Sequence, residues 1–178
     1  MGHKHSRDEI LAGAAELATE DGLSQLTFGR VAKRLGVSDR IVVYYFPTKD
    51  TLITEVIGSI GADLQSVLAG AVAAPVADHR DLVRQAWPVL TTPEADATFA
   101  LFFEALGLAA AGRSPYRDLV PQLFAFWIGW ARSFFVGPDE ECLAEAEGAI
   151  ALLDGLLLLR QMQGAEVANR AAAALGVN

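Results

Sequence analysis

The chain has little cysteine and little histidine. Its 178 residues include one cysteine, Cys142, and three histidines. One cysteine excludes an intrachain disulfide, and the set is too small for a Cys/His zinc cluster. The sequence therefore predicts no metal, no other cofactor and a fold held by packing, which fits a reducing cytoplasm.

Long hydrophobic runs are also missing. Polar residues or proline, such as Glu104, Pro121 and Asp154, interrupt the longest apolar stretches, which therefore stay shorter than the roughly 18 residues of a membrane span. The N-terminal MGHKHSRDE has no apolar core of a secretory signal. These absences predict a cytoplasmic protein with no membrane partner.

Patterns typical of catalysis are missing as well. There is no G-x-G-x-x-G, Walker loop, H-E-x-x-H or nucleophile elbow. Cys142 follows Glu140 and Glu141, and this acidic setting disfavours a thiolate nucleophile. We therefore expect that the protein is not an enzyme.

What the sequence does contain is apolar residues at helical spacing, with 52% hydrophobic residues overall and no alternating strand pattern. We expect an all-α fold, preceded by an arm at residues 1–5 (with His3, Lys4 and His5) that approaches DNA or stays disordered. Serine or threonine marks most predicted helix starts, and Ser6 begins a capping box. Pro121 should kink the first turn of its helix or separate that turn from the rest. The predicted helices cover residues 6–22, 27–36, 38–46, 48–69, 82–90, 92–111, 114–137, 139–163 and a short last segment to Leu175.

Residues 27–50 carry the most specific pattern. Phe28, Val31, Ala32 and Leu35 form one apolar stripe, and Gly36 ends that helix. A second helix follows after a short turn, which is the helix-turn-helix pattern. From residue 22 to residue 49 the chain has one acid, Asp39, and five bases, on a protein with 14 bases and 22 acids in total. Such a basic island is what phosphate binding needs; the bases are Arg30, Lys33, Arg34, Arg40 and Lys49.

The same residues resemble a known family. L-T-F-x-x-V-A-x-x-L-G-V-S, seven residues, then F-P-T-K-D-x-L is similar to the DNA-binding region of the tetracycline-repressor (TetR) family of bacterial transcription regulators. The resemblance covers roughly residues 7 to 60 and departs from the family at Arg40 and Val43. It implies a helix-turn-helix domain at residues 1–50 and a helical ligand-binding and dimerisation domain at residues 51–178, connected through the long helix 48–69.

We expect a double-stranded palindromic DNA operator as the partner. The start of the second helix is its exposed end, where an arginine suits guanine, a carboxylate suits cytosine and an aliphatic side chain suits a thymine methyl. Hydroxyl and lysine groups near helix starts suit phosphates. The predicted base contacts are Asp39, Arg40 and Ile41, and the predicted phosphate contacts are Thr27, Tyr44, Tyr45 and Lys49.

Two later segments, 123–135 and 149–159, are apolar on almost every side. Because such helices must be buried all round, we expect a homodimer through them; a compact monomer with a large core is the alternative. The predicted dimer contacts are Phe126, Trp130, Ile150, Leu153, Asp154 and Leu157.

Further aromatic residues suggest a pocket for a largely apolar small-molecule effector, and the family resemblance implies that such a ligand lowers DNA affinity. A ligand-responsive regulator, most simply a repressor, is the predicted function. A helical small-molecule-binding or adaptor protein without DNA binding is the alternative. The predicted ligand contacts are Trp87, Phe99, Phe102, Phe103, Glu104, Phe124 and Trp127.

Overall fold

The computed structural model describes residues 6–177, and the predicted all-α class is confirmed over this range. The expected arm at residues 1–5 lies outside the described residues. The elements are α1 (Arg7–Asp21), the one-turn 3-10 helix η1 (Leu23–Gln25), α2 (Phe28–Leu35), α3 (Asp39–Tyr45), α4 (Lys49–Ala71), α5 (His79–Leu90), α6 (Pro93–Ala110), α7 (Tyr116–Arg132), α8 (Asp139–Gln163) and α9 (Ala165–Leu175).

Four helix starts of the described range follow the predicted capping chemistry. The capping box of α1 is complete, with the Glu9 N–H donating to Ser6 Oγ at 3.2 Å and the Ser6 N–H donating to Glu9 Oε2 at 2.7 Å. Threonine hydroxyls accept from backbone N–H groups at the starts of three more helices, α2, α4 and α6. The capping threonines are Thr27, Thr48 and Thr92.

Two local predictions are wrong, and a third is wrong in part. Ser38 precedes α3 without a side-chain cap; the Ile41 N–H, which a capping hydroxyl would bind, donates to the Ser38 carbonyl at 2.9 Å instead. Ser114 does not cap α7, because this helix begins at Tyr116 and Pro115, not Ser114, directly precedes it; the Ser114 hydroxyl instead donates to Asp50 Oδ2 at 2.8 Å. Of the two alternatives predicted for Pro121, a separate first turn is wrong, because Pro121 lies inside the single helix α7, which tolerates the lost N–H donor; a kink there stays a prediction.

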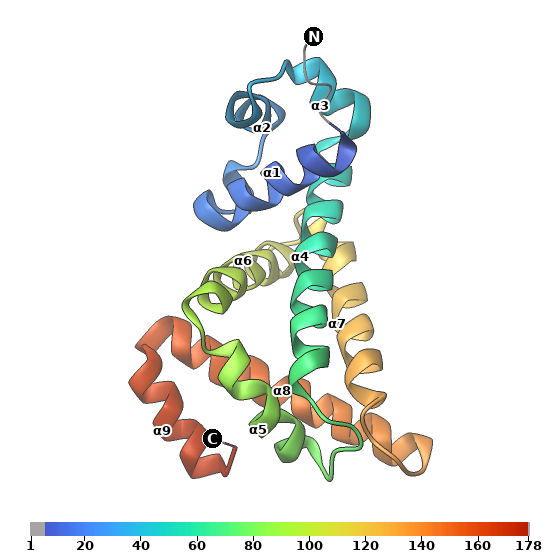
Figure 1. Ribbon diagram of the computed structural model, residues 1–178, viewed down its shortest axis with the longest axis vertical. Helices are drawn as coiled ribbons and strands as arrows, with labels where there is room; N and C mark the ends of the chain where they lie inside the picture. Colours follow the sequence, from blue (N-terminus) through green and yellow to red (C-terminus); the bar gives the residue numbers. More distant parts are fainter. Residues whose placement is uncertain (1–5, 178) are drawn as a thin grey trace. The chain divides into compact units, whose positions relative to one another are not determined.

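The chain divides into two compact units, Met1–Leu64 with Leu101–Leu119, and Gln65–Ala100 with Val120–Asn178. In unit 1, α2 contacts α1 and α3, and α1 also contacts η1; Figure 1 shows α1, α2 and α3 around the start of α4. Val42, Phe46 and Leu52 are 0% exposed at its centre. Burying such a side chain contributes about 1.5–3 kcal/mol, so this core fixes α3 against α4.

Arg7 adds a polar tie at the edge of unit 1. Its guanidinium forms an ion pair with Glu55 of α4 and lies 5.1 Å from the centre of the Phe46 ring. A partly exposed ion pair contributes modestly by itself, but one side chain here joins the start of α1, the end of α3 and α4.

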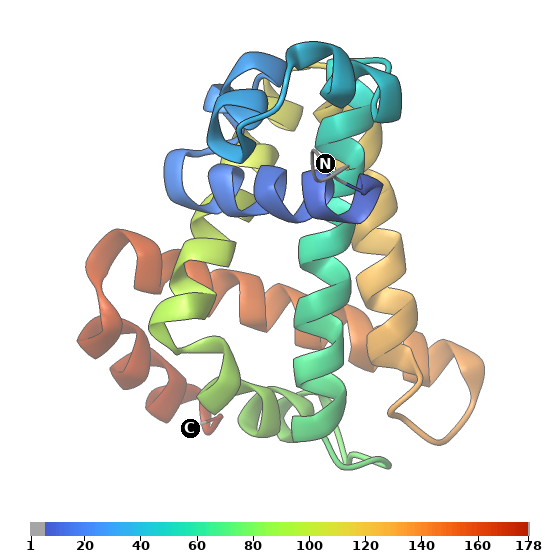
Figure 2. The ribbon, with the colours of Figure 1, turned by 45° about the horizontal axis from the view of Figure 1, so that its top comes forward.

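In unit 2, α8 contacts both α5 and α9 (Figure 2). Trp87 of α5 is buried, and its indole N–H donates to Asn169 of α9 at 3.3 Å. Arg160 of α8 donates to both carboxylate oxygens of Asp96 and to the Thr91 carbonyl. These contacts hold the start of α6 to the C-terminal helices.

One helix of the described range, α4, is long and apolar enough to cross a membrane by length and composition alone. Core helices of water-soluble folds pass the same test. Its first turns contain Leu52, Ile53 and Val56, which are packed in the core of unit 1. This packing accounts for the apolar composition of that part of α4 without a membrane.

Candidate nucleic-acid interface

The turn between α2 and α3 is fixed by backbone geometry. Gly36 adopts the left-handed conformation (φ 67°, ψ 29°). Its N–H donates to the Lys33 carbonyl, and the Val37 N–H donates to the Ala32 carbonyl at 3.0 Å. These two bonds form a Schellman motif, which closes α2 and sets the direction of the chain entering α3. No heavy atom lies within 4 Å of a Cβ built at Gly36, so the backbone conformation, rather than space, requires glycine.

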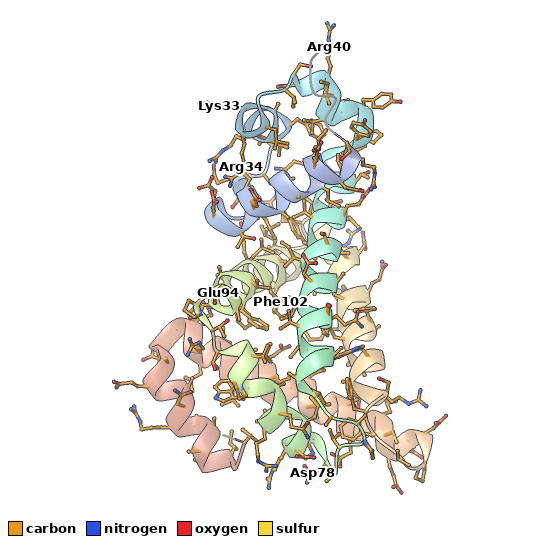
Figure 3. The ribbon with its side chains drawn as sticks, viewed as in Figure 1. Lys33, Arg34, Arg40, Asp78, Glu94 and Phe102 are labelled. Atoms are coloured by element: carbon orange, nitrogen blue, oxygen red, sulfur yellow. The ribbon has the colours of Figure 1, made fainter. Side chains whose placement is uncertain are left out.

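Helix α3 buries one side and exposes the other. Val42 is buried against the core, while Tyr44 is 78% exposed, Val43 40% and Ile41 37%. Large apolar side chains grouped on one exposed face are typical of a binding surface. Asp39 and Arg40 are exposed at the start of the same helix, and Arg40 extends away from it in Figure 3.

The five bases of the island are not equivalent. Arg30 forms an ion pair with Asp21 at 2.7 Å. Arg34 binds Glu20 at 2.6 Å and Glu16 at 3.2 Å; these carboxylates hold the guanidinium on the α1 side of α2. Two of the predicted positive charges are therefore already neutralised by α1.

Within residues 6–177, no hydrogen bond or ion pair engages the side chains of Lys33, Arg40 and Lys49, and all three are exposed. We call these three residues the unpaired cations. Lys33 was not among the predicted contacts, because a residue count cannot tell a paired base from an unpaired one. Of the five bases of the island, these three are the ones whose charge no carboxylate of the described residues pairs.

Two helix starts place further polar groups on unit 1. The Thr27 hydroxyl accepts from the Arg30 N–H at 3.3 Å, and its own hydrogen stays available for donation. Thr48 caps α4 by accepting from the Thr51 N–H at 3.0 Å, which places Lys49 in the first turn. A helix N-terminus with a lysine attracts an anion. Tyr44 and Tyr45 stack edge to face, with ring centres 5.0 Å apart.

Glu104, one of the predicted ligand contacts, already has hydrogen-bond partners within unit 1. Its carboxylate accepts from the Leu23 N–H at 2.7 Å, from the Ser24 N–H at 2.9 Å and from the Ser24 hydroxyl. Burial by itself would raise the pKa of Glu104, but these hydrogen bonds outweigh it and hold the pKa below its usual value. A ligand contact at Glu104 would have to break this set of bonds.

The other predicted ligand residues divide between the units. Phe102 and Phe103 belong to unit 1, and the rest belong to unit 2. In unit 2, Trp87 is 5% exposed and Phe99 8%, so both serve its core, whereas Phe124 and Trp127 are half-buried. That these side chains line one pocket stays a prediction.

Two of the predicted dimer contacts are already buried inside one chain. Leu153 is 8% exposed and Leu157 2%, so they offer almost no surface to a partner and belong to the core of unit 2. Phe126 is 49% exposed, and Trp130, Ile150 and Asp154 are half-buried. Burial raises the pKa of Asp154 to about 6.

Comparison with known protein sequences finds similarity to bacterial transcription regulators. Residues 10–56 match the model of bacterial regulatory proteins of the tetR family. The HTH-type transcriptional regulator BetI 1 of Chromohalobacter salexigens is 33% identical over 78 residues, which cover 44% of this chain and 39% of that protein. The match thus spans well under half of the relative's length.

Solved structures share the fold. A TetR transcriptional regulator from Legionella pneumophila aligns with a TM-score of 0.65 at 21% identity, over 98% of this chain and 97% of that one. The multidrug binding protein EbrR, solved with imidazole, aligns with a TM-score of 0.71 at 21% identity, over 98% of this chain and 93% of that one. At this identity the likeness establishes the arrangement of helices.

Proposed function

Since the chain belongs to the tetracycline-repressor (TetR) family of bacterial transcription regulators, we propose that it is a dimeric cytoplasmic repressor released from a palindromic operator by a small molecule. The observation that carries the proposal is the face of α3. Arg40 and Asp39 stand exposed at its start, Tyr44 is 78% exposed, and Val42 anchors the opposite side in the core. A helix held in this way suits insertion into the major groove.

The roles follow from chemistry and position. Arg40 reads guanine, Asp39 accepts from a cytosine amino group and Ile41 contacts a thymine methyl. Phosphates are bound around them by hydroxyl groups and by lysine, which set register without carrying sequence information. The phosphate contacts are Thr27, Tyr44, Tyr45 and Lys49, to which we add Lys33.

The dimer forms through the exposed sides of α7 and α8. On α8, Ala151, Gly155, Leu158 and Met162 recur at helical spacing on the side away from α5 and α9; Leu158 is 45% exposed and Met162 64%. On α7, exposed Phe126 adjoins Gly129. Space is open at both Gly129 and Gly155, so a partner helix can approach closely. Two-fold pairing then presents two α3 helices to half-sites about 34–36 Å apart or a multiple of that.

The effector is aromatic or largely apolar. Trp127 stacks edge to face on Phe126 at 5.7 Å and on Trp130 at 5.4 Å between ring centres, and half-buried Phe124 lies one turn earlier on α7. Aromatic walls of this kind bind flat or cationic organic molecules. Release from DNA requires that the effector bind more tightly to a dimer whose α3 helices are wrongly spaced.

Selection of duplexes from a random-sequence pool tests the proposal. We expect the parent protein to enrich a palindrome. Arg40→Ala should lose about 1–3 kcal/mol at one base pair and relax the preference there, whereas Lys49→Ala should weaken all sequences alike. Arg170→Ala, on the exposed side of α9, is the matched control and should bind as the parent does.

A parent protein that retards no duplex at low salt contradicts the proposal. That result would favour the alternative, a helical small-molecule-binding or adaptor protein. If the parent protein binds but Arg40→Ala and Lys49→Ala both match it, the protein binds DNA through residues other than the ones assigned.

A further inference from the structure

The segment Leu101–Leu119 is far from the helix-turn-helix in sequence, yet it belongs to the same compact unit. It contains the second part of α6 and the first residues of α7. Two of its side chains, Glu104 and Ser114, hydrogen-bond to the elements that precede or carry the proposed phosphate contacts.

The first contact is a cap on η1 that a residue distant in sequence, Glu104 of α6, supplies. Gly22 precedes η1 and has no side chain, so no local residue caps this turn. Glu104 fills that role, because its two carboxylate oxygens accept from the N–H groups of Leu23 and Ser24 at 2.7 and 2.9 Å. A Cβ at Gly22, where φ is +90°, would stand 2.9 Å from Glu104 Oε2. The glycine therefore provides both the backbone conformation and the room for the carboxylate.

The second contact reaches the start of α4. The Ser114 hydroxyl donates to Asp50 Oδ2 at 2.8 Å, and Asp50 adjoins Lys49. Tyr116 is buried in the same region; burial above all, and then the negative charges of Glu104 and Asp50, raise its pKa to about 12. The segment Leu101–Leu119 thus contacts η1, which ends two residues before Thr27, and it also contacts the first turn of α4.

We propose that Glu104 and Ser114 are positioning residues for DNA binding. They fix the distance between the two phosphate-binding helix starts, Thr27 at α2 and Lys49 at α4, although neither residue touches DNA. This inference rests on the proposed function. It predicts that removing either hydrogen-bond contact weakens DNA binding although every DNA-contacting side chain is retained in the sequence.

The experiment measures anisotropy of the labelled duplex that the parent protein enriches. Glu104→Gln keeps the size of the side chain but removes its charge and replaces one acceptor with a donor. We expect binding about tenfold weaker, within the range for coupled contacts, with an unchanged slope of log K against log salt, because no cation is lost. Glu94→Gln, exposed at the start of the same helix (Figure 3), is the matched control and should bind as the parent does.

A double-mutant cycle separates positioning from general stability. Thr27→Ala should cost less in the Glu104→Gln background than in the parent, since a displaced helix start has already lost its phosphate. Stoichiometric titration gives the active fraction of each variant, so a partly unfolded sample does not imitate weaker binding. Additive effects in the cycle would overturn the proposed role of Glu104.

Ser114→Ala provides a variant that leaves folding intact, because Ser114 is exposed. We expect binding about threefold weaker, the low end of the contribution of one hydrogen bond, because the bond to the Asp50 carboxylate is exposed to water; Ser66→Ala on α4 is the control. If folded Glu104→Gln and Ser114→Ala both bind as the parent does, the inference is overturned while the proposed function stands. A parent protein that binds no duplex overturns both.

Discussion

The salt dependence of DNA binding distinguishes paired from unpaired charges. Arg34 is held by Glu16 and Glu20, whereas Lys49 has no side-chain partner among the described residues. The informative perturbations are therefore Lys49→Ala and Arg34→Ala. Each removes one positive charge from the same basic island, but only Lys49 is free to replace a counterion on DNA.

The expected magnitude follows from a count of the unpaired cations, Lys33, Arg40 and Lys49. Three in each protomer give six in a dimer, and each cation that replaces a counterion on the duplex, whether at a phosphate or in the groove as for Arg40, contributes about −0.9 to the slope of log K against log salt. The predicted slope is therefore about −5, which corresponds to a loss of about 10³ in affinity between 50 and 200 mM salt. If all five bases of the island took part, ten charges would give a slope of about −9 and a loss of about 10⁵.

Equilibrium titration of the enriched duplex across that salt range measures the slope. Lys49→Ala should reduce its magnitude by about 2 in the dimer, one unit for each protomer, and Arg34→Ala should leave it near −5. Loss of Arg34 frees two carboxylates, so affinity falls through repulsion at every salt concentration tested. A parent slope near −9, or an equal reduction of the slope in both variants, would refute the distinction between paired and unpaired bases.

Two further predictions concern unit 2. Because the pKa of Asp154 is raised to about 6 from 3.8, its ionised form opposes folding, and stability from this group falls as pH rises from about 4 through 6. Asp154→Asn should remove this pH dependence and stabilise the protein above pH 7 by at most about 3 kcal/mol. Urea unfolding at fixed protomer concentration measures the free energy of unfolding; the same pH profile in the parent and the variant would refute the prediction. Leu158→Asp should produce monomers in sedimentation at micromolar concentration, while Leu175→Asp, at an equally exposed leucine of α9, should leave a dimer; two dimeric variants would place the interface elsewhere.

Local chemistry made some helix boundaries predictable, whereas the predicted helix 114–137 is observed as α7, Tyr116–Arg132. The predicted span of α8, 139–163, coincides with the observed Asp139–Gln163, because Pro138 starts that helix and Gly164 ends it. Thr27, Thr48 and Thr92 act as caps since a hydroxyl and an N–H three residues apart need no other part of the chain. Ser114 shows the limit of this reasoning: α7 begins one residue later than the Ser-Pro pattern predicts, and the Ser114 hydroxyl donates to Asp50, 64 residues away in the sequence.

Burial within one chain was harder to assign. The run of apolar residues in α8 predicts that all of its sides are covered, but it does not say which side faces α5 and α9. Leu153 and Leu157 proved to face inward, and Leu158 outward. The helical period groups residues by face correctly, and only the packing of the neighbouring helices decides which face is free.

The charge island shows why the position of acids matters as much as their number. From residue 22 to residue 49 the bases outnumber the acids, yet Glu16, Glu20 and Asp21 lie just before that window and bind two of those bases. Unit 1 therefore does not work as a diffuse positive patch. The carboxylates of α1 form ion pairs with Arg30 and Arg34 of α2. The unpaired cations are the bases of the island that stay available to bind phosphates. The three α1 carboxylates just before the island are engaged in ion pairs, so we expect them to repel a phosphate less than free carboxylates would.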